Sequence, residues 1–227
     1  MRDGKASYFE ELKKPGDSVY GTLKKAIHSG YLAPGERLVE ARLSRELNTG
    51  RTPIREAFKK LEMERLIKIR PNKGATVIKL SPEEIGELYM IGGVLEGKAA
   101  FFATERLKSE HIKKLKELHN KMADEELRKN YPEFAKANYR FHKVYLKECG
   151  KSILFHKIRE TLNSLPRYWY MCCSLPKLIE ISIIQHDELI SAFENKDAEL
   201  VRRIAEDHVI TIGQILKEHL EMLPDII

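Results

Sequence analysis

Three histidines and one asparagine fall on apolar faces of predicted helices, where polar side chains are unexpected. Asn138 and His142 stand one turn apart in YPEFAKANYRFHKVYLKECG, His186 falls in IEISIIQHDELISAF, and His208 falls in VRRIAEDHVITIGQIL. Residues four apart lie over the same helix face, so these side chains point toward whatever the apolar stripes pack against. Buried imidazoles need partners, and a divalent cation would provide one by taking up their lone pairs. The chemistry indicated is metal coordination.

The spacing of the histidines favours one shared site. His186 lies 44 residues after His142, and His208 lies 22 residues after His186. Each separation lets the chain travel along a helical bundle and return to about the same height. A single inward histidine is more often a core residue with hydrogen-bond partners, so a core network of hydrogen bonds is the alternative interpretation.

Six helices are predicted to position these side chains, over about 82–104, 109–128, 132–148, 152–171, 176–194 and 197–222. Ser81 and Glu84 have the spacing of a capping box before the first helix. Pro132 and Gly150 mark later junctions, and no strand pattern competes. The fold expected over residues 81–227 is an all-α antiparallel helical bundle.

The first 80 residues indicate three short helices followed by a hairpin. Helical spacing of apolar residues recurs over 17–29, EARLSREL predicts a helix over 40–47, and RTPIREAFKKLEMERL predicts one over 51–66. LIKIR and ATVIK then flank PNKG, which predicts a two-stranded hairpin. This order is that of a winged helix-turn-helix and predicts a DNA-binding domain over residues 1–80, within a protein that is mainly α.

Charge separates the same two parts of the chain. Residues 1–80 hold 18 Lys and Arg against 10 Asp and Glu, a net charge of +8, whereas the remainder holds 22 against 24, a net charge of −2. A basic first third favours a module that binds a polyanion such as nucleic acid, although a solvated surface gives the same imbalance.

The helix predicted over 51–66 carries residues suited to DNA contact. Arg51, Arg55 and Lys59 are spaced four apart and form a row opposite the apolar positions. Arginine can bond guanine O6 and N7 in a major groove, and Thr52 can bond a phosphate or a base. Lys73, at the expected wing tip, is placed for a phosphate or the minor groove. A solvated charged face is the alternative.

The cysteine spacing and the lack of long apolar runs indicate the cellular compartment of the protein. The three cysteines, Cys149, Cys172 and Cys173, are an odd number without CxxC spacing, which favours reduced thiols over a disulfide framework or a zinc knuckle. No run approaches the roughly 18 apolar residues needed to span a bilayer, and the opening residues lack an apolar signal segment. A cytoplasmic protein without membrane contact is expected.

The stretch PGERLVEARLSRELNTGRTPIREAFKKLEMERLIKIRPNKGATV resembles the DNA-binding domain of the GntR family of bacterial transcription regulators. The resemblance covers residues 17–79 and includes a PG-x-x-L turn, an RTPVREAL-like recognition helix and a P-x-x-G-x-x-V wing. It implies that Arg51 and Arg55 contact operator bases. The chain departs from the family at 48–50, where NTG replaces a Gly, a small apolar residue and a Ser, so Gly50 lacks the serine hydroxyl that could touch phosphate.

The pattern Asn-x-x-x-His, a QHDELISAF-like helix and a histidine in the last helix resembles the metal-binding FCD domain of the FadR branch, in its six-helix, VanR-like form. The resemblance implies that a divalent transition metal, with zinc or nickel as leading identities, is held by Asn138, His142, His186 and His208. Many relatives have Asp where Asn138 stands. The ligand set here is neutral, so an ion would keep its full charge and favour an anion such as a carboxylate.

A second departure concerns the effector. Many relatives place an acid-binding arginine in the first bundle helix, where this chain has Gly92. Anion recognition would then rest on the metal, or on Arg159 or Arg167, unless the effector is not an acid.

The function expected is that of a homodimeric transcription regulator that binds a palindromic double-stranded operator and responds to a small organic acid. A metal-dependent hydrolase or lyase with a basic appendage is the alternative from another class. Against it, there is no HExxH, and Asp187, Glu206 and Asp207 lie off the inward stripes, which leaves no evident general base. A third interpretation takes the bundle as a dimerisation domain with structural histidines.

Overall fold

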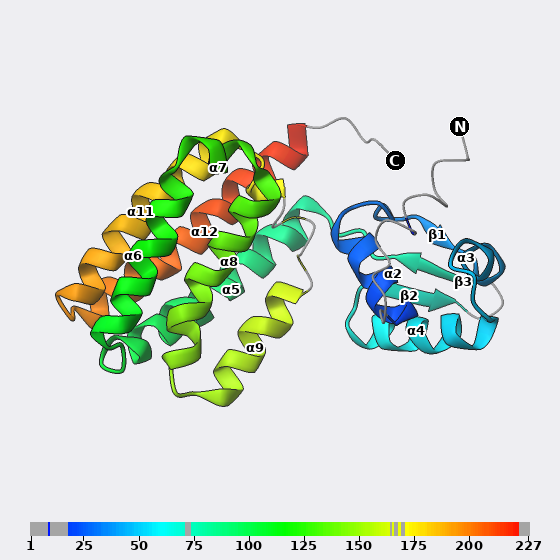
Figure 1. The fold of residues 1–227 in the computed structure, drawn as a ribbon, viewed down its shortest axis with the longest axis horizontal. Coiled ribbons are helices and arrows are strands. Elements are labelled where there is room, and N and C mark those ends of the chain that lie inside the picture. Colours follow the sequence, from blue (N-terminus) through cyan, green and yellow to red (C-terminus); the bar gives the residue numbers. More distant parts are fainter. Residues whose placement is uncertain are drawn as a thin grey trace. The chain divides into compact units, whose positions relative to one another are not determined.

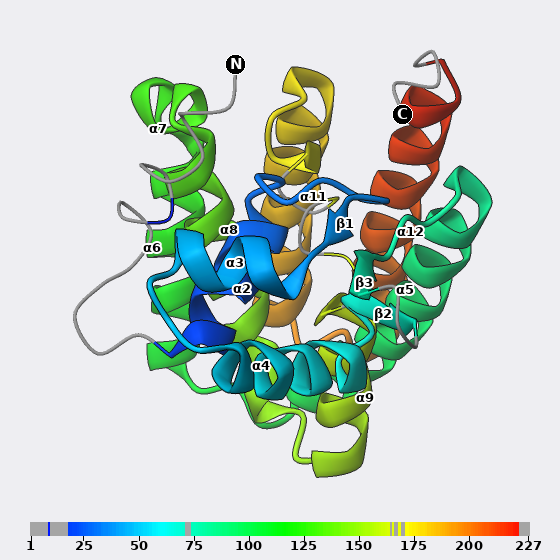
Figure 2. The same ribbon diagram turned by 90° about the vertical axis from the view of Figure 1, so that its right-hand side faces the viewer.

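A computed structural model describes residues 9, 18–70, 74–163, 165, 168 and 171–222. The described residues are mainly helical and include one small sheet (Figures 1 and 2), which confirms the expected fold class. They divide into two units, one ending at Leu80 and the other beginning at Ser81, and each unit has its own buried apolar core.

Over its described residues from 18 onward, the first unit combines three helices with a three-stranded sheet (Figure 1). Its elements are α2 (Val19–His28), β1 (Arg37–Leu38), α3 (Glu40–Glu46), α4 (Arg51–Met63), β2 (Ile67–Arg70) and β3 (Gly74–Val77). Strand β3 is central and pairs antiparallel with both β1 and β2. The prediction of a two-stranded hairpin was therefore incomplete. Strand β1 has only two residues, which is too short to show an alternating pattern in the sequence. It is a strand only because it pairs with β3.

Local backbone geometry places α4 after α3. The chain turns through Asn48, whose φ of 46° is left-handed. Gly50 then occupies the N-cap position of α4 with an extended backbone and no side-chain hydrogen bond. Ile54, Phe58 and Leu61 are buried, so α4 packs with one face on the core of this unit and leaves the opposite face exposed.

The second unit is a bundle of helices (Figure 1). Those described are α5 (Pro82–Thr104), α6 (Ser109–Ala123), α7 (Glu125–Lys129), α8 (Tyr131–Glu148), α9 (Ser152–Asn163), α11 (Pro176–Glu194) and α12 (Ala198–Met222). The long helices α5 and α12 pack along each other, and α6 packs against α8 and α11. Among the described helices, none is both long and apolar enough to cross a membrane.

Two predicted helices end earlier than expected. The helix predicted over 109–128 breaks at Asp124, whose backbone is extended and whose side chain caps α7 by accepting the N–H of Leu127. The helix predicted over 152–171 ends at Asn163, and Leu165 is not helical. Leu165 precedes Pro166, and the residue before a proline disfavours the α conformation.

Glycines allow the close contact of α5 and α12. A Cβ added at Gly213 would lie 2.2 Å from Cβ of Tyr89, and one added at Gly97 would lie 2.7 Å from the carbonyl oxygen of Arg202. This contact fixes the height of α5 relative to α12, and these two helices contribute Tyr89, Glu96 and His208 to the site.

Candidate functional site

Helices α8, α11 and α12 each place one histidine in the core of the second unit. His142, His186 and His208 offer nitrogens that all lie within 4.8 Å of one another. His186 is 1% exposed and His208 is 4% exposed. Two nitrogens bound to one ion at about 2.1 Å, at octahedral or tetrahedral angles, lie about 3.0–3.4 Å apart. The widest pair of histidine nitrogens would therefore have to close by about 1.5 Å for the three rings to share an ion.

Hydrogen bonds orient two of the rings. Nδ1 of His142 lies 2.5 Å from Oε1 of Glu96, and Nδ1 of His208 lies 2.9 Å from Oε1 of Gln185. Because both oxygens are acceptors, each Nδ1 carries the proton and each Nε2 keeps a lone pair. Nε2 of His142 faces Nε2 of His186 at 3.3 Å. The lone pairs are thus available at the centre of the cluster.

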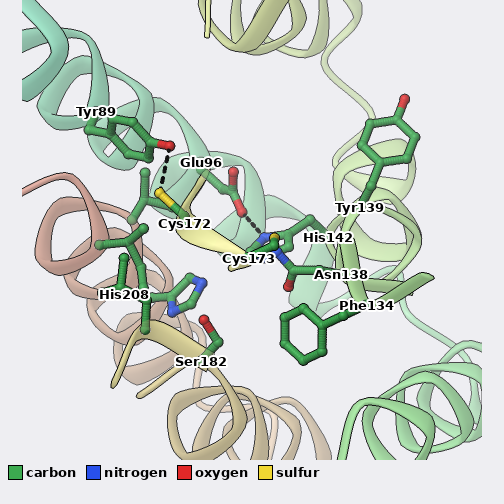
Figure 3. Close-up of a pocket in the computed structure, with 13 residues that line it drawn as sticks. Tyr89, Glu96, Phe134, Asn138, Tyr139, His142, Cys172, Cys173, Ser182 and His208 are labelled. Carbon is green, nitrogen blue, oxygen red and sulfur yellow. Dashed lines mark hydrogen bonds and ion pairs between the residues drawn. The ribbon is translucent and has the colours of Figure 1, made fainter. Parts of the chain in front are cut away.

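Glu96 of α5 is the carboxylate of this cluster, and sequence reasoning missed it. It is 2% exposed and accepts a hydrogen bond from His142 (Figure 3). It also accepts a hydrogen bond from the Tyr145 hydroxyl. Burial by itself raises the pKa of the Glu96 carboxyl, but His142 and Tyr145 outweigh it and hold that pKa below its usual value. Its position one turn after Gly92, on an otherwise apolar helix face, was the available signal.

Burial keeps the other two histidines neutral. It lowers the pKa of His208 to about 3, and it lowers the pKa of His186 well below its usual value, with neighbouring histidines adding to both effects. Neutral imidazole is the form that binds a metal. The ring of His186 also stacks on Phe141 with the ring centroids 4.1 Å apart, which holds its plane.

Two buried polar atoms at the cluster have no hydrogen-bond partner among the described residues. They are Oδ1 of Asn138 and Nδ1 of His186. Asn138 is 6% exposed and lies at the pocket beside His142 (Figure 3). Leaving such a group buried and unpaired costs about 1–3 kcal/mol. Three imidazoles and one unpaired amide oxygen fit the donor preferences of a divalent transition metal.

A pocket opens beside the histidines (Figure 3) and holds about 600 Å³ of empty space, its mouth included. His142, His208 and Asn138 contribute to its lining. Its wall is otherwise mostly apolar or aromatic, formed in part by Tyr89, Phe134, Leu178, Val209 and Ile212. The enclosed part of the pocket is about 60 Å³, which is room for a few water-sized groups, so a small organic molecule next to the histidine nitrogens would extend into the mouth.

Two cysteines line the same pocket. Cys172 and Cys173 are buried and free of disulfides. Burial raises the pKa of the Cys172 thiol to about 12, and its sulfur lies 3.3 Å from the hydroxyl of Tyr89. The thiol is therefore protonated at pH 7 and adds no charge to the pocket.

The arginines expected to hold an anion are not in the described pocket wall. Arg159 is exposed on α9, with its guanidinium 5.9 Å from the ring centroid of Phe155, and it does not line the pocket. Arg167 lies outside the described residues. Gly92 is buried on α5, and a Cβ added there would lie 3.8 Å from Val209, which lines the pocket.

In the first unit, the side chains expected to contact DNA share the exposed face of α4, namely Arg51, Thr52, Arg55 and Lys59. Nε of Arg55 donates to Oε2 of Glu40 in α3 at 2.8 Å. This pair uses one edge of the guanidinium and leaves its two terminal nitrogens for other acceptors. Lys73 lies outside the described residues. The pairing of Arg55 with Glu40 was not predicted from the sequence.

Comparisons with known proteins agree with both units. Residues 15–77 match the bacterial regulatory proteins of the gntR family, and residues 87–211 match the FCD domain. The chain is 27% identical over 201 residues to the HTH-type transcriptional repressor RspR of Escherichia coli, covering 88% of each chain. It is 29% identical over 196 residues to the gluconate operon transcriptional repressor of Bacillus licheniformis, covering 82% of this chain and 78% of that one.

Among solved structures, Escherichia coli McbR/YncC has a TM-score of 0.72 at 23% identity, covering 88% of this chain and 96% of that one, so the two share a fold. The matched families and relatives are transcription regulators and not enzymes, which removes the hydrolase or lyase alternative. The chain belongs to the GntR family of bacterial transcription regulators and carries an FCD domain after its helix-turn-helix domain.

Proposed function

We propose that this regulator binds a divalent transition metal at Asn138, His142, His186 and His208, and that a small organic acid in the adjacent pocket modulates its binding to an operator. The observation that carries the proposal is the convergence of three histidine nitrogens within 4.8 Å, beside the unpaired Oδ1 of Asn138. Zinc and nickel are the leading identities because both accept imidazole ligands.

The residues around the ligands have supporting roles. Glu96 and Gln185 accept the Nδ1 protons of His142 and His208, which directs the Nε2 lone pairs of both rings toward the centre. Phe141 holds the plane of His186. When bound, the metal supplies a positive charge that attracts an anion.

The charge balance supports a carboxylate effector. The four proposed ligands are neutral, and Glu96 provides one negative charge, so a divalent ion leaves the site with a net positive charge. The exposed position of Arg159 outside the pocket supports the metal rather than this arginine as the anion-binding group. One relative is named for a gluconate operon, and gluconate is an organic acid.

The DNA-binding part of the proposal places α4 in a major groove. Arg51 and Arg55 would bond base edges, Thr52 and Lys59 would bond phosphates or bases, and Lys73 would reach a phosphate from the wing. Two copies would bind the two halves of a palindromic operator, so the functional form is a homodimer. The effector changes operator affinity only if it binds two arrangements of the dimer with different affinity.

Metal content tests the first half of the proposal. Untagged protein, purified without a chelating column, is analysed by mass spectrometry for the wild type, His142→Ala and His156→Ala. His156 is an exposed histidine of α9 outside the cluster and serves as the matched control. We expect about one equivalent of metal in the wild type and the control, and its loss in His142→Ala. Wild-type protein that takes up no zinc, nickel or manganese would make the cluster a core hydrogen-bond network.

Operator binding tests the second half. Duplexes selected from a random pool by the wild-type protein serve as the probe, and Arg203→Ala, an exposed arginine of α12, serves as the control. Losing one bidentate arginine contact to guanine costs about 1–3 kcal/mol. Arg55→Ala should therefore bind the selected duplex about 5- to 150-fold more weakly, with unchanged metal content. Normal binding by Arg55→Ala would refute the assignment of α4 as the recognition helix.

A further inference from the structure

Two adjacent cysteines face one cavity in the second unit. Cys172 and Cys173 are 5% and 4% exposed, and both line the pocket beside the histidines (Figure 3). Consecutive residues of a helix point about 100° apart, so two such side chains seldom face the same cavity. Here Cys172 is helical, whereas Cys173 lies in the turn that follows, where the N–H of Leu175 donates to the carbonyl oxygen of Cys172 at 3.2 Å. The end of the helical segment thus brings both thiols to one pocket wall.

The pair is poorly placed to form a disulfide. The peptide between the two cysteines is trans, and a trans peptide holds consecutive Cα atoms about 3.8 Å apart. Disulfide-bonded cysteines usually have Cα atoms about 4.4–6.8 Å apart. Burial also raises the pKa of the Cys172 thiol to about 12 and raises the pKa of the Cys173 thiol above its usual value, so both lack the thiolate form that oxidants attack. An atom bonded to both sulfurs would lengthen the bridge and remove the constraint on the Cα spacing.

Metal cations suit this pair less well than a neutral ligand does. Among the described residues, the metal-binding atoms that converge are the nitrogens of the three histidines, and neither sulfur belongs to that group. A four-coordinate ion such as zinc would therefore lack ligands beside the thiols. Monovalent copper bound by two thiolates alone would bury a net negative charge, and the described pocket lining includes no lysine or arginine to balance it. The pair calls for a ligand that needs two sulfurs and no further protein ligand.

We propose that Cys172 and Cys173 bind trivalent arsenic in this pocket as a cyclic dithiol adduct. Arsenous acid, As(OH)₃, is uncharged at pH 7 and has three ligands. Two As–O bonds break and two As–S bonds form, each thiol proton leaves with a hydroxyl group as water, and one hydroxyl stays on the arsenic. The arsenic stays trivalent, so the step needs no oxidant or reductant. Because reactants and adduct are neutral, no charge is buried among the apolar side chains.

The size and the polar groups of the pocket fit this adduct. The enclosed part of about 60 Å³ has room for a few water-sized groups, which is what an arsenic atom with one hydroxyl needs. The hydroxyl of Tyr89 lies 3.3 Å from the sulfur of Cys172 and can donate to or accept from the hydroxyl left on arsenic. The site uses none of the four proposed metal ligands, so the inference does not depend on a metal at the histidines. It adds a thiophilic ligand to the organic acid proposed for the same pocket.

Arsenite binding by the full chain tests the site. Native mass spectrometry and arsenic content after gel filtration, both without added thiols, are measured for the wild type, Cys172→Ser, Cys173→Ser, the double variant and Cys149→Ser. Cys149 is the matched control, because it is also buried and free but lies outside the pocket lining. We expect one arsenic per chain, with the mass of As(OH)₃ less two water molecules, in the wild type and Cys149→Ser. Each single pocket variant should bind arsenite about a hundredfold more weakly, because the second As–S bond forms within one complex.

Circular dichroism checks that each variant is folded, and the mass of the wild-type adduct tests the chemistry without any substitution. A wild type that takes up no arsenic from excess arsenite would overturn the site. An adduct that has lost only one water molecule would overturn it as well, since a single sulfur would then hold the arsenic. Undiminished binding in the folded double variant, or loss of binding in folded Cys149→Ser, would place the arsenic elsewhere and overturn the assignment to Cys172 and Cys173.

Discussion

Replacing Glu96 with glutamine separates the charge of the buried carboxylate from its shape. Glutamine keeps a side-chain oxygen that can accept hydrogen bonds from Tyr145 and His142, but it is neutral. Glu96 is 2% exposed, so water screens its charge little, and its Oε1 lies 2.5 Å from Nδ1 of His142. Losing the charge makes the His142 ring a weaker electron donor and therefore a weaker metal ligand.

The expected loss follows from this geometry. Removing an outer partner of a metal ligand lowers metal affinity about 10–100-fold, or about 1.4–2.7 kcal/mol. The near-complete burial of Glu96 places the expected effect in the upper half of that range. Because glutamine keeps the shape and an acceptor, the metal-free protein should change in unfolding free energy by no more than about 1 kcal/mol.

A competition titration against a chromophoric chelator measures the zinc affinity of the wild type, Glu96→Gln and Asp207→Asn at pH 7.5. Asp207 is the exposed neighbour of His208, so its variant removes an acid of the same kind from outside the cluster. We expect Asp207→Asn to bind zinc as the wild type does. Wild-type affinity in Glu96→Gln would refute the reasoning that Glu96 strengthens His142 as a ligand.

Three further predictions concern stability. Gly213→Ala should lower the unfolding free energy by about 1–3 kcal/mol in urea titrations, because the new Cβ would meet Cβ of Tyr89 at 2.2 Å. Ser81→Ala should cost about 1 kcal/mol in the same assay, since its hydroxyl caps α5. Metal-free protein should lose stability as the pH falls below about 6.5, because the unfolded state binds protons that folded His186 and His208, both with lowered pKa, do not. Each of these two histidines lowers the unfolding free energy by about 1.4 kcal/mol for each pH unit. The urea concentration at the unfolding midpoint should therefore decrease as the pH is lowered from about 6 to about 4.5, and it should decrease less in His208→Gln.

Local signals in the sequence determined the elements and the faces they present. The capping box at Ser81 places the start of α5, and helical periodicity separates the exposed Arg51 and Arg55 from the buried Ile54. The same periodicity turns His142 and the other two histidines inward. These features depend on residues a few positions apart, where backbone geometry alone sets which side chains share a face.

Only the tertiary structure decided which inward groups meet. Glu96 and His142 are 46 residues apart in the chain, and Gln185 and His208 are 23 apart, yet each pair is joined by a hydrogen bond. The two-residue strand β1 likewise exists only through its pairing with β3. Such contacts depend on the height and rotation at which distant elements pack. That packing is set by close fits such as Gly213 against α5, which the periodicity of a single helix does not encode.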